Sequence, residues 1–108
     1  MLTGYRLMWM MVLFDLPVGT ETERKAANDF RHFLYDQGFE RAQYSVYLRL
    51  CSSREQCDTY VRYVRENLPD EGKVDILFFT DKQYENIVSF HAGRKRPPRK
   101  NPDQFVLF

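Results

Sequence analysis

Four polar side chains recur at helical spacing between residues 24 and 35. They are Arg24, Asn28, Arg31 and Tyr35, separated by four, three and four positions. This spacing puts them on one face of a helix. Guanidinium groups bind phosphate through paired hydrogen bonds, and Asn and Tyr can add single ones, so the face suits a phosphate backbone. An ordinary solvated helix face is the alternative, and the spacing alone leaves both open.

A second group of cations lies near the C-terminus. Five positive charges fall within seven residues, at Arg94, Lys95, Arg96, Arg99 and Lys100. Because the whole chain has a formal charge of +1, the remainder carries −4. The run has no base-reading geometry, so it predicts sequence-independent attraction to nucleic acid. The alternatives are a solubilising linker and a segment that docks on an acidic protein surface.

Metal and disulfide patterns give little support to a zinc site. Cys51 and Cys57 have five residues between them, and His32 and His91 are the two histidines. This matches no four-ligand zinc spacing, so we interpret both cysteines as reduced thiols. His32 is interpreted as a surface residue rather than a general base.

The first half of the chain predicts a strand followed by a helix. With 108 residues the chain suits one compact domain. Residues 7–14 are apolar on both alternating faces, as in a strand that is covered on both sides. Thr20 and Glu23 form a capping box, and apolar residues then recur at helical spacing up to Gly38. This pattern predicts a helix over residues 20–37.

Two strands, a second helix and a last strand are expected next. Residues 39–50 favour β-structure but are about twice as long as a usual strand, so we divide them into two antiparallel strands that turn near residues 43–45. Ser53 with Gln56, or Ser52 with Glu55, caps a helix that ends before Pro69. A strand over 74–79, then a helical turn and a short strand over 87–91, complete the domain. The order indicates an α+β, two-layer sandwich of the ferredoxin-like split βαβ type (βαββαβ).

The two-sided first strand leaves an apolar sheet face that two helices cannot cover. Such a face implies a partner, and a two-fold homodimer that stacks sheet on sheet would cover it. The alternative is a monomer whose C-terminal segment folds back over its own sheet. We assign residues 1–92 to the domain and residues 93–108 to a basic Pro-rich linker with a terminal β-segment. That segment, residues 105–108, is expected to add to a sheet edge of this chain or of its partner.

Membrane insertion and export are not expected. The longest apolar run, residues 7–14, is about a third of the length that a membrane-spanning helix needs. No export signal was recognised at the start of the sequence, so the expected location is cytoplasmic.

Several motifs follow one another in a specific order. They are Met11-Val-Leu-Phe-Asp-Leu-Pro17, Arg24-Lys-Ala26, Phe30-Arg-His-Phe-Leu34, Gly38-Phe39 and Gln43-Tyr-Ser-Val-Tyr47. Over about its first 80 residues the chain resembles the CRISPR-associated protein 2 family, the small dimeric subunit of the spacer-acquisition machinery. The resemblance implies a ferredoxin-like homodimer that bridges dimers of a CRISPR integrase subunit and holds a short double-stranded DNA. It also implies that the helix carrying Arg24 and Arg31 faces this DNA.

The same resemblance implies a metal-dependent endonuclease that acts on RNA or double-stranded DNA, with Asp15 as metal ligand and catalytic residue. A carboxylate-bound Mg²⁺ or Mn²⁺ neutralises the phosphate and activates a water. One carboxylate is a poor site, so the ion is expected between the two Asp15 residues of a dimer. The alternative for Asp15 is a turn residue that accepts local backbone hydrogen bonds. A toxin-type endoribonuclease on the same fold and a ligand-binding regulatory module remain competing functions.

Overall fold

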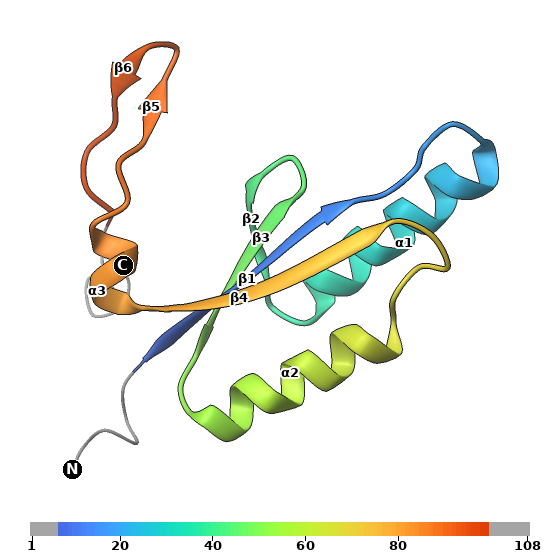
Figure 1. The fold of residues 1–108 in the computed structure, drawn as a ribbon, viewed down its shortest axis with the longest axis horizontal. Coiled ribbons are helices and arrows are strands. Elements are labelled where there is room, and N and C mark those ends of the chain that lie inside the picture. The colour runs from blue at the N-terminus through green and yellow to red at the C-terminus, as the bar shows by residue number, and fades with distance from the viewer. Residues whose placement is uncertain (1–6, 100–108) are drawn as a thin grey trace.

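A four-stranded antiparallel sheet forms the centre of the domain (Figure 1). The computed structural model describes residues 7–99. The sheet order is β2-β3-β1-β4, and its strands are β1 (Met8–Asp15), β2 (Glu40–Gln43), β3 (Val46–Cys51) and β4 (Lys73–Thr80). The apolar strand β1 is central, with β3 on one side and β4 on the other. The predicted α+β class and the predicted order of the main elements are confirmed.

Two capped helices pack on one face of the sheet. Helix α1 (Glu21–Asp36) begins at the predicted capping box, in which the Thr20 hydroxyl accepts from the Glu23 amide at 3.1 Å and the Glu23 carboxylate accepts from the Thr20 amide at 2.9 Å. Helix α2 (Arg54–Glu66) begins where the Ser53 hydroxyl accepts from the Gln56 amide at 3.1 Å. These caps satisfy amides that have no partner within the helix, which fixes both starting points.

The β-rich stretch after α1 does divide into two strands. Tyr44 and Ser45 form the turn between β2 and β3, as predicted, although no Gly or Pro marks it. The register of the β2–β3 pair shifts between Arg41 and Gln43, so β2 carries a bulge. The Ser45 carbonyl accepts from the Phe14 amide at 3.1 Å, which ties the turn to the end of β1.

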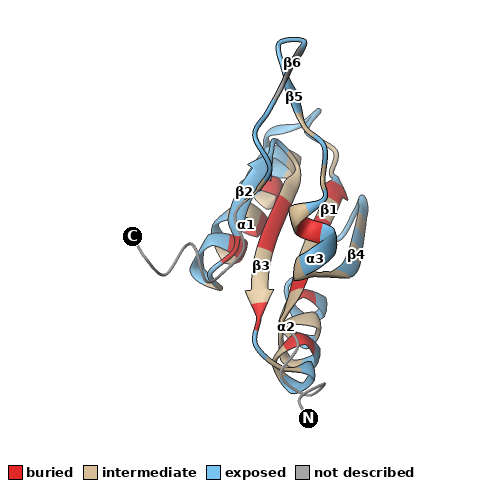
Figure 2. Cartoon of the chain, turned by 90° about the vertical axis from the view of Figure 1, so that its left-hand side faces the viewer, coloured by how far each residue is buried: buried red, intermediate tan, exposed pale blue. Residues whose placement is uncertain are grey.

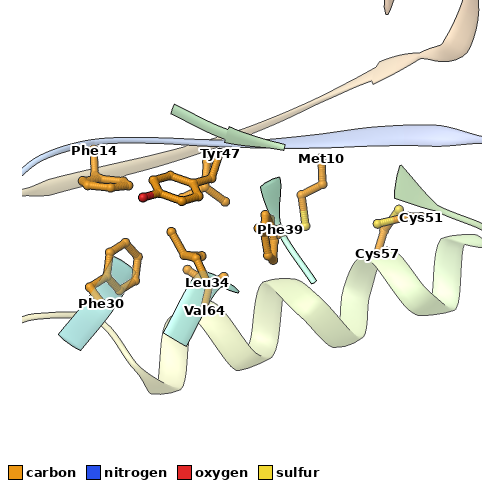
Figure 3. Close-up of a cluster of buried hydrophobic side chains, with 10 residues drawn as sticks. Met10, Phe14, Phe30, Leu34, Phe39, Tyr47, Cys51, Cys57 and Val64 are labelled. Carbon is orange, nitrogen blue, oxygen red and sulfur yellow. The ribbon is translucent and has the colours of Figure 1, made fainter. Parts of the chain in front are cut away.

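The main core lies between the sheet and the two helices (Figure 3). Alternate residues of β1 point into it, and they meet side chains from α1, α2 and β3. Leu34, Tyr47 and Val64 are among the fully buried members. The core residues labelled in Figure 3 are Met10, Phe14, Phe30, Leu34, Phe39, Tyr47, Cys51, Cys57 and Val64.

A short helix covers one end of the opposite sheet face. In α3 (Asp81–Glu85) the Tyr84 ring stacks on Trp9, with centroids 4.0 Å apart and planes 17° apart. The Trp9 indole N–H donates to an Asp81 carboxylate oxygen at 3.2 Å. Farther along the face, Met11 is half-buried and Leu77 is 44% exposed. The bare apolar face is therefore smaller than expected, because the segment after β4 folds back over part of it (Figure 2).

The basic segment does not begin as a linker. Strands β5 (Phe90–His91) and β6 (Arg94–Lys95) form a separate two-stranded hairpin that projects from the sheet (Figure 1). Ala92 and Gly93 have φ angles of 53° and 82°, which suits a tight two-residue hairpin turn. The prediction of a solvated linker from residue 93 is wrong for this part, because the prolines begin only at Pro97 and leave the Arg94 and Lys95 amides able to pair. The strand that was expected over residues 87–91 is shorter in the structure, where β5 comprises Phe90–His91.

One predicted element lies outside the described residues: the segment 105–108, which was expected to add to a sheet edge. Within residues 7–99, no helix is long and apolar enough to span a bilayer.

Candidate nucleic-acid interface

Asp15 is the last residue of β1 and its side chain is exposed. It lies opposite Lys73 of β4, and it has the same strand parity as Trp9 and Met11, which puts it on the sheet face away from α1 and α2. Within residues 7–99, no hydrogen bond or ion pair involves its carboxylate. Lys73 instead pairs with Asp75 at 3.5 Å. The local hydrogen bonds of the turn-residue alternative are therefore not observed.

The backbone of Asp15 is confined by a neighbouring glycine. Gly72 has φ +100°, a conformation that favours glycine. A Cβ at this position would lie 2.8 Å from the Asp15 carbonyl oxygen and 2.8 Å from the Leu16 side chain. The turn that leads into β4 therefore closes tightly on the end of β1.

Arg31 is more enclosed than its helical spacing suggested. Its guanidinium lies 5.7 Å from the Phe14 ring centroid and 4.9 Å from that of Tyr44, and it donates to the Asn28 side-chain oxygen at 3.1 Å. Its Nε atom is buried without a partner among the described residues. Arg31 is therefore partly buried rather than on a freely solvated helix face, because the β2–β3 turn lies against this part of α1.

Arg41 and Tyr44 belong to the same surface. The Arg41 guanidinium lies 5.1 Å from the centroid of the Tyr44 ring, which is 65% exposed. We call Arg31, Arg41 and Tyr44 the arginine–tyrosine cluster. It lies at the same end of β1 as Asp15 but on the helix side of the sheet, because Arg31 contacts Phe14, whose side chain points to the face opposite that of Asp15. Sequence reasoning assigned no role to Arg41 or Tyr44. Their position at or beside the predicted turn was the feature of the sequence that could have indicated one.

The other predicted residues of α1 have mixed surroundings. Arg24 is exposed and donates to the Val18 carbonyl at 3.2 Å, so it also braces the loop before the helix. Asn28 is exposed and accepts from Arg31. Tyr35 is 49% exposed and makes an edge contact with Tyr47, at 5.4 Å between centroids. His32 is exposed, as a surface residue would be.

The structure does not bring the C-terminal cations to Asp15. Arg94 and Lys95 lie in the hairpin beyond α3, at the Trp9 end of β1, and Arg96 follows them as an exposed residue. At about 3.4 Å per residue, Trp9 and Asp15 are about 20 Å apart along the strand. Arg99 donates to the Ser89 hydroxyl and lies over the Tyr84 ring, so it packs back on the domain. A single chain therefore presents two separate cationic regions.

Metal ligands are sparse within one chain. Residues 7–99 contain no group of three or more His, Cys, Asp or Glu side chains that could hold a metal ion. Cys51 and Cys57 are both free and buried in the main core, next to each other (Figure 3). Burial raises the pKa of the Cys51 thiol to about 12, which keeps it protonated at neutral pH. Neither cysteine lies near Asp15.

Comparison with known proteins identifies the family. A family described as CRISPR associated protein Cas2 matches residues 8–87, which include Asp15 and the whole arginine–tyrosine cluster. This chain belongs to the Cas2 family. Cas2 relatives extend beyond the matched range and include proteins that cover nearly all of the chain.

Two of these Cas2 relatives carry the name CRISPR-associated endoribonuclease Cas2. The protein from Paracidovorax avenae is 60% identical over 108 residues, which is all of both chains. The protein from Flavobacterium psychrophilum is 39% identical over 107 residues, covering 99% of this chain and 93% of its own. A solved structure titled "Crystal structure of cas2" aligns with a TM-score of 0.57 and 19% identity, over 87% of this chain and 95% of that one. At this identity the likeness supports the fold alone.

Proposed function

We propose that this Cas2 protein binds nucleic acid as a homodimer and cleaves it with a metal ion held between two Asp15 carboxylates. The observation that carries the proposal is the position of Asp15. Its carboxylate, unpaired within residues 7–99, ends the central strand and belongs to the half-covered apolar face of the sheet, and the arginine–tyrosine cluster lies at the same strand end on the opposite face. A carboxylate that holds a cation and guanidiniums that bind phosphate oxygens can then act on different stretches of one nucleic acid that passes around this end of the sheet.

A homodimer would complete this site. The apolar residues Met11, Leu13 and Leu77 share the sheet face with Asp15 and are only partly covered. Two ferredoxin-like domains that stack these faces would bury apolar area and bring the two copies of Asp15 together. One chain offers a single carboxylate at this end of β1, whereas Mg²⁺ is held by one or two carboxylates together with water and phosphate. The residues present therefore fit an ion only when a second copy contributes.

The bound ion would be Mg²⁺ or Mn²⁺, and it would neutralise the phosphate and activate a water. The chain's own residues have the other tasks. Arg31 and Arg41 hold the phosphate backbone on the helix side of the same sheet end, and Arg24 extends this surface toward the start of α1. The Arg94–Arg96 cations add attraction that does not depend on sequence.

The substrate and partner proposals rest on different supports. RNA is supported by the names of the relatives, which call those proteins endoribonucleases. Double-stranded DNA, and a CRISPR integrase subunit whose dimers the homodimer bridges, follow from the family resemblance. Binding along a phosphate backbone does not require a catalytic ion, so both roles are compatible with one surface.

The test of this proposal is the substitution Asp15→Asn. Asn keeps the shape of the side chain but loses the charge that a hard cation requires. We expect cleavage of RNA or duplex DNA in Mg²⁺ or Mn²⁺ to fall to the level measured without metal, whereas the Kd for duplex DNA changes less than about two-fold. The matched control is Asp75→Asn, because Asp75 lies on the same sheet face but is paired with Lys73. Cleavage that survives in Asp15→Asn would contradict the assignment of the catalytic residue.

A reconstituted spacer-insertion reaction separates the scaffold role from the nuclease role. With the integrase present, Asp15→Asn should insert duplex DNA at the wild-type rate, because the integrase performs the strand transfer. Loss of insertion while DNA binding persists would show that the carboxylate itself takes part in acquisition.

A further inference from the structure

We propose that Tyr44 is a positioning residue that holds Arg31 and Arg41 together as one phosphate-binding pair. The two arginines come from different elements, α1 and β2, and within residues 7–99 Tyr44 is the one aromatic ring that both guanidiniums contact. This inference rests on the proposed binding of nucleic acid and adds a residue on which that binding depends.

The exposure of Tyr44 argues against a role in the core. Its ring is 65% exposed, whereas nearby Tyr47 is fully buried. Its described contacts are the guanidinium of Arg31 at 4.9 Å and that of Arg41 at 5.1 Å from the ring centroid. Such cation–π contacts hold an arginine by the flat face of its guanidinium. The N–H groups along the guanidinium edge then stay available for phosphate oxygens.

The turn that carries Tyr44 and the Arg31 side chain are each held by further contacts. The carbonyl of Ser45, the next residue, accepts from the Phe14 amide at 3.1 Å, which fixes the turn against β1. Arg31 is also restrained by the Asn28 side-chain oxygen at 3.1 Å and by the Phe14 ring. These contacts keep the arginine–tyrosine cluster at the Phe14 end of β1 rather than leaving it on a free loop.

Holding the two cations before a ligand arrives favours binding for two reasons. A long arginine side chain loses rotamer entropy when it is fixed, and a pre-positioned one loses less on binding. Two positive charges kept on one ring also repel each other, and a phosphate bound by both relieves that repulsion. Tyr44 therefore acts through the arginines. The alternative role is direct stacking of Tyr44 on an unpaired base. This role would require the ring surface that the two guanidiniums already contact, so the base would have to displace an arginine.

A double-mutant cycle tests which role is correct. The measurement is the Kd of a short fluorescein-labelled DNA duplex, determined by fluorescence anisotropy. We expect Tyr44→Leu to weaken binding about ten-fold, and Tyr44→Phe to stay within about two-fold of wild type because the ring is retained. In the Arg31→Ala/Arg41→Ala background, Tyr44→Leu should cause no further loss, since the residues it positions are absent. An equal loss in both backgrounds would overturn the proposal, because Tyr44 would then contact the nucleic acid itself or only support the turn.

Phe78→Leu is the matched control. Phe78 is a 39% exposed aromatic residue of β4 with no role in the proposed interface, and within residues 7–99 no guanidinium lies over its ring. This substitution should leave duplex affinity within about two-fold of wild type. A ten-fold loss would show that removal of any exposed aromatic ring affects binding, and it would contradict a specific role for Tyr44.

A ligand-free measurement keeps this inference separate from the proposed function. In NMR spectra of the ¹⁵N-arginine-labelled protein, the ring current of Tyr44 should shift the Nε–Hε signals of Arg31 and Arg41. In Tyr44→Leu the Arg41 signal should move to the position of free arginine, and the Arg31 signal should move part of the way, since the Phe14 ring still lies near it. Both signals should stay in place in Tyr44→Phe. Unchanged signals in Tyr44→Leu would refute the positioning role. If the wild-type protein does not bind the duplex, nucleic-acid binding is wrong, and the arginine signals still decide whether Tyr44 holds them.

Discussion

The surroundings of each guanidinium decide what an arginine does in this chain. Arg49 donates to the Gln37 carbonyl at 2.8 Å and lies 3.9 Å from the Tyr60 ring centroid. It therefore satisfies a carbonyl at the C-terminal end of α1, where a positive charge also favours the helix dipole. Gly38, with φ +87°, leaves room for this contact, because a Cβ there would collide with the Arg49 guanidinium. Arg41 makes no such hydrogen bond within residues 7–99 and stays exposed beside the Tyr44 ring, so its N–H groups are available to a ligand.

Cys51 gives a prediction about stability at alkaline pH. Burial raises the pKa of its thiol to about 12, whereas the thiol of the unfolded chain has the ordinary value near 9. Between these values the unfolded chain loses the proton first, so the free energy of unfolding should fall as pH rises, by at most about 1.4 kcal/mol per pH unit. Urea titrations of Cys51→Ala over the same pH range should show a shallower decline. An identical decline in both proteins would show that Cys51 does not cause it.

At the level of elements, α3 joins the C-terminal half of the chain to the sheet. Its N-cap is a second capping box, between Thr80 and Gln83, and it directly continues β4. The Tyr84 ring lies on Trp9 and faces Phe79 at 6.4 Å between centroids. Although α3 has only five residues, its Tyr84 completes a second apolar cluster with Trp9 and Leu48, on the sheet face opposite the main core.

We expect Tyr84→Ala to release this helix. The substitution removes a buried aromatic ring, so the free energy of unfolding in urea should fall by about 3–5 kcal/mol. Val88→Ala serves as the control, because Val88 is exposed and its truncation should change stability by less than about 0.5 kcal/mol. If both variants lost the same amount, the stack of Tyr84 on Trp9 would not be a stabilising contact.

The elements also show what could be predicted from sequence. The starts of α1 and α2 depend on Thr20 and Ser53, whose hydroxyls accept from the amides three positions later, so local patterns located them. The enclosure of Arg31 depends on Tyr44, which is distant in sequence and lies in another element, and no helical spacing encodes that contact. The same holds for the cover that α3 provides, because a five-residue helix gives too short a pattern to predict where it packs. The chemistry of Asp15 was suggested by a family resemblance, whereas its exposure and its neighbours came from the fold.

At the level of the whole molecule, the two layers of the domain differ in how completely they are covered. The helix side of the sheet encloses the main core, with Val12, Leu34 and Tyr47 fully buried. The other side is covered by α3 at one end and remains open toward Asp15, where Leu77 is 44% exposed. This asymmetry places the surface available to a second copy at the same end as the candidate site.

Leu77→Glu should therefore separate the proposed homodimer. Light scattering of the wild-type protein should give about twice the chain mass of 13.0 kDa, and the variant should approach the single-chain mass. Leu68→Glu is the control, because Leu68 is 46% exposed but lies just after α2, away from the open sheet face. It should remain dimeric. A wild-type protein that is monomeric at micromolar concentration would contradict the dimer. A monomeric Leu68→Glu would show that the dimer interface involves the helix layer rather than the open sheet face.

The tight approach of Gly72 to Asp15 has a consequence for how this sequence can vary over generations. Position 72 carries no functional group, yet any side chain there would displace the backbone that carries the candidate catalytic carboxylate. Such a change would move the Asp15 backbone, and with it the carboxylate, while the main core stays packed. A folded, abundant and inactive protein is then the expected result of drift at this position. Within the family, the glycine should persist for as long as the carboxylate is under selection, and it should become free to vary in lineages where that selection has ended.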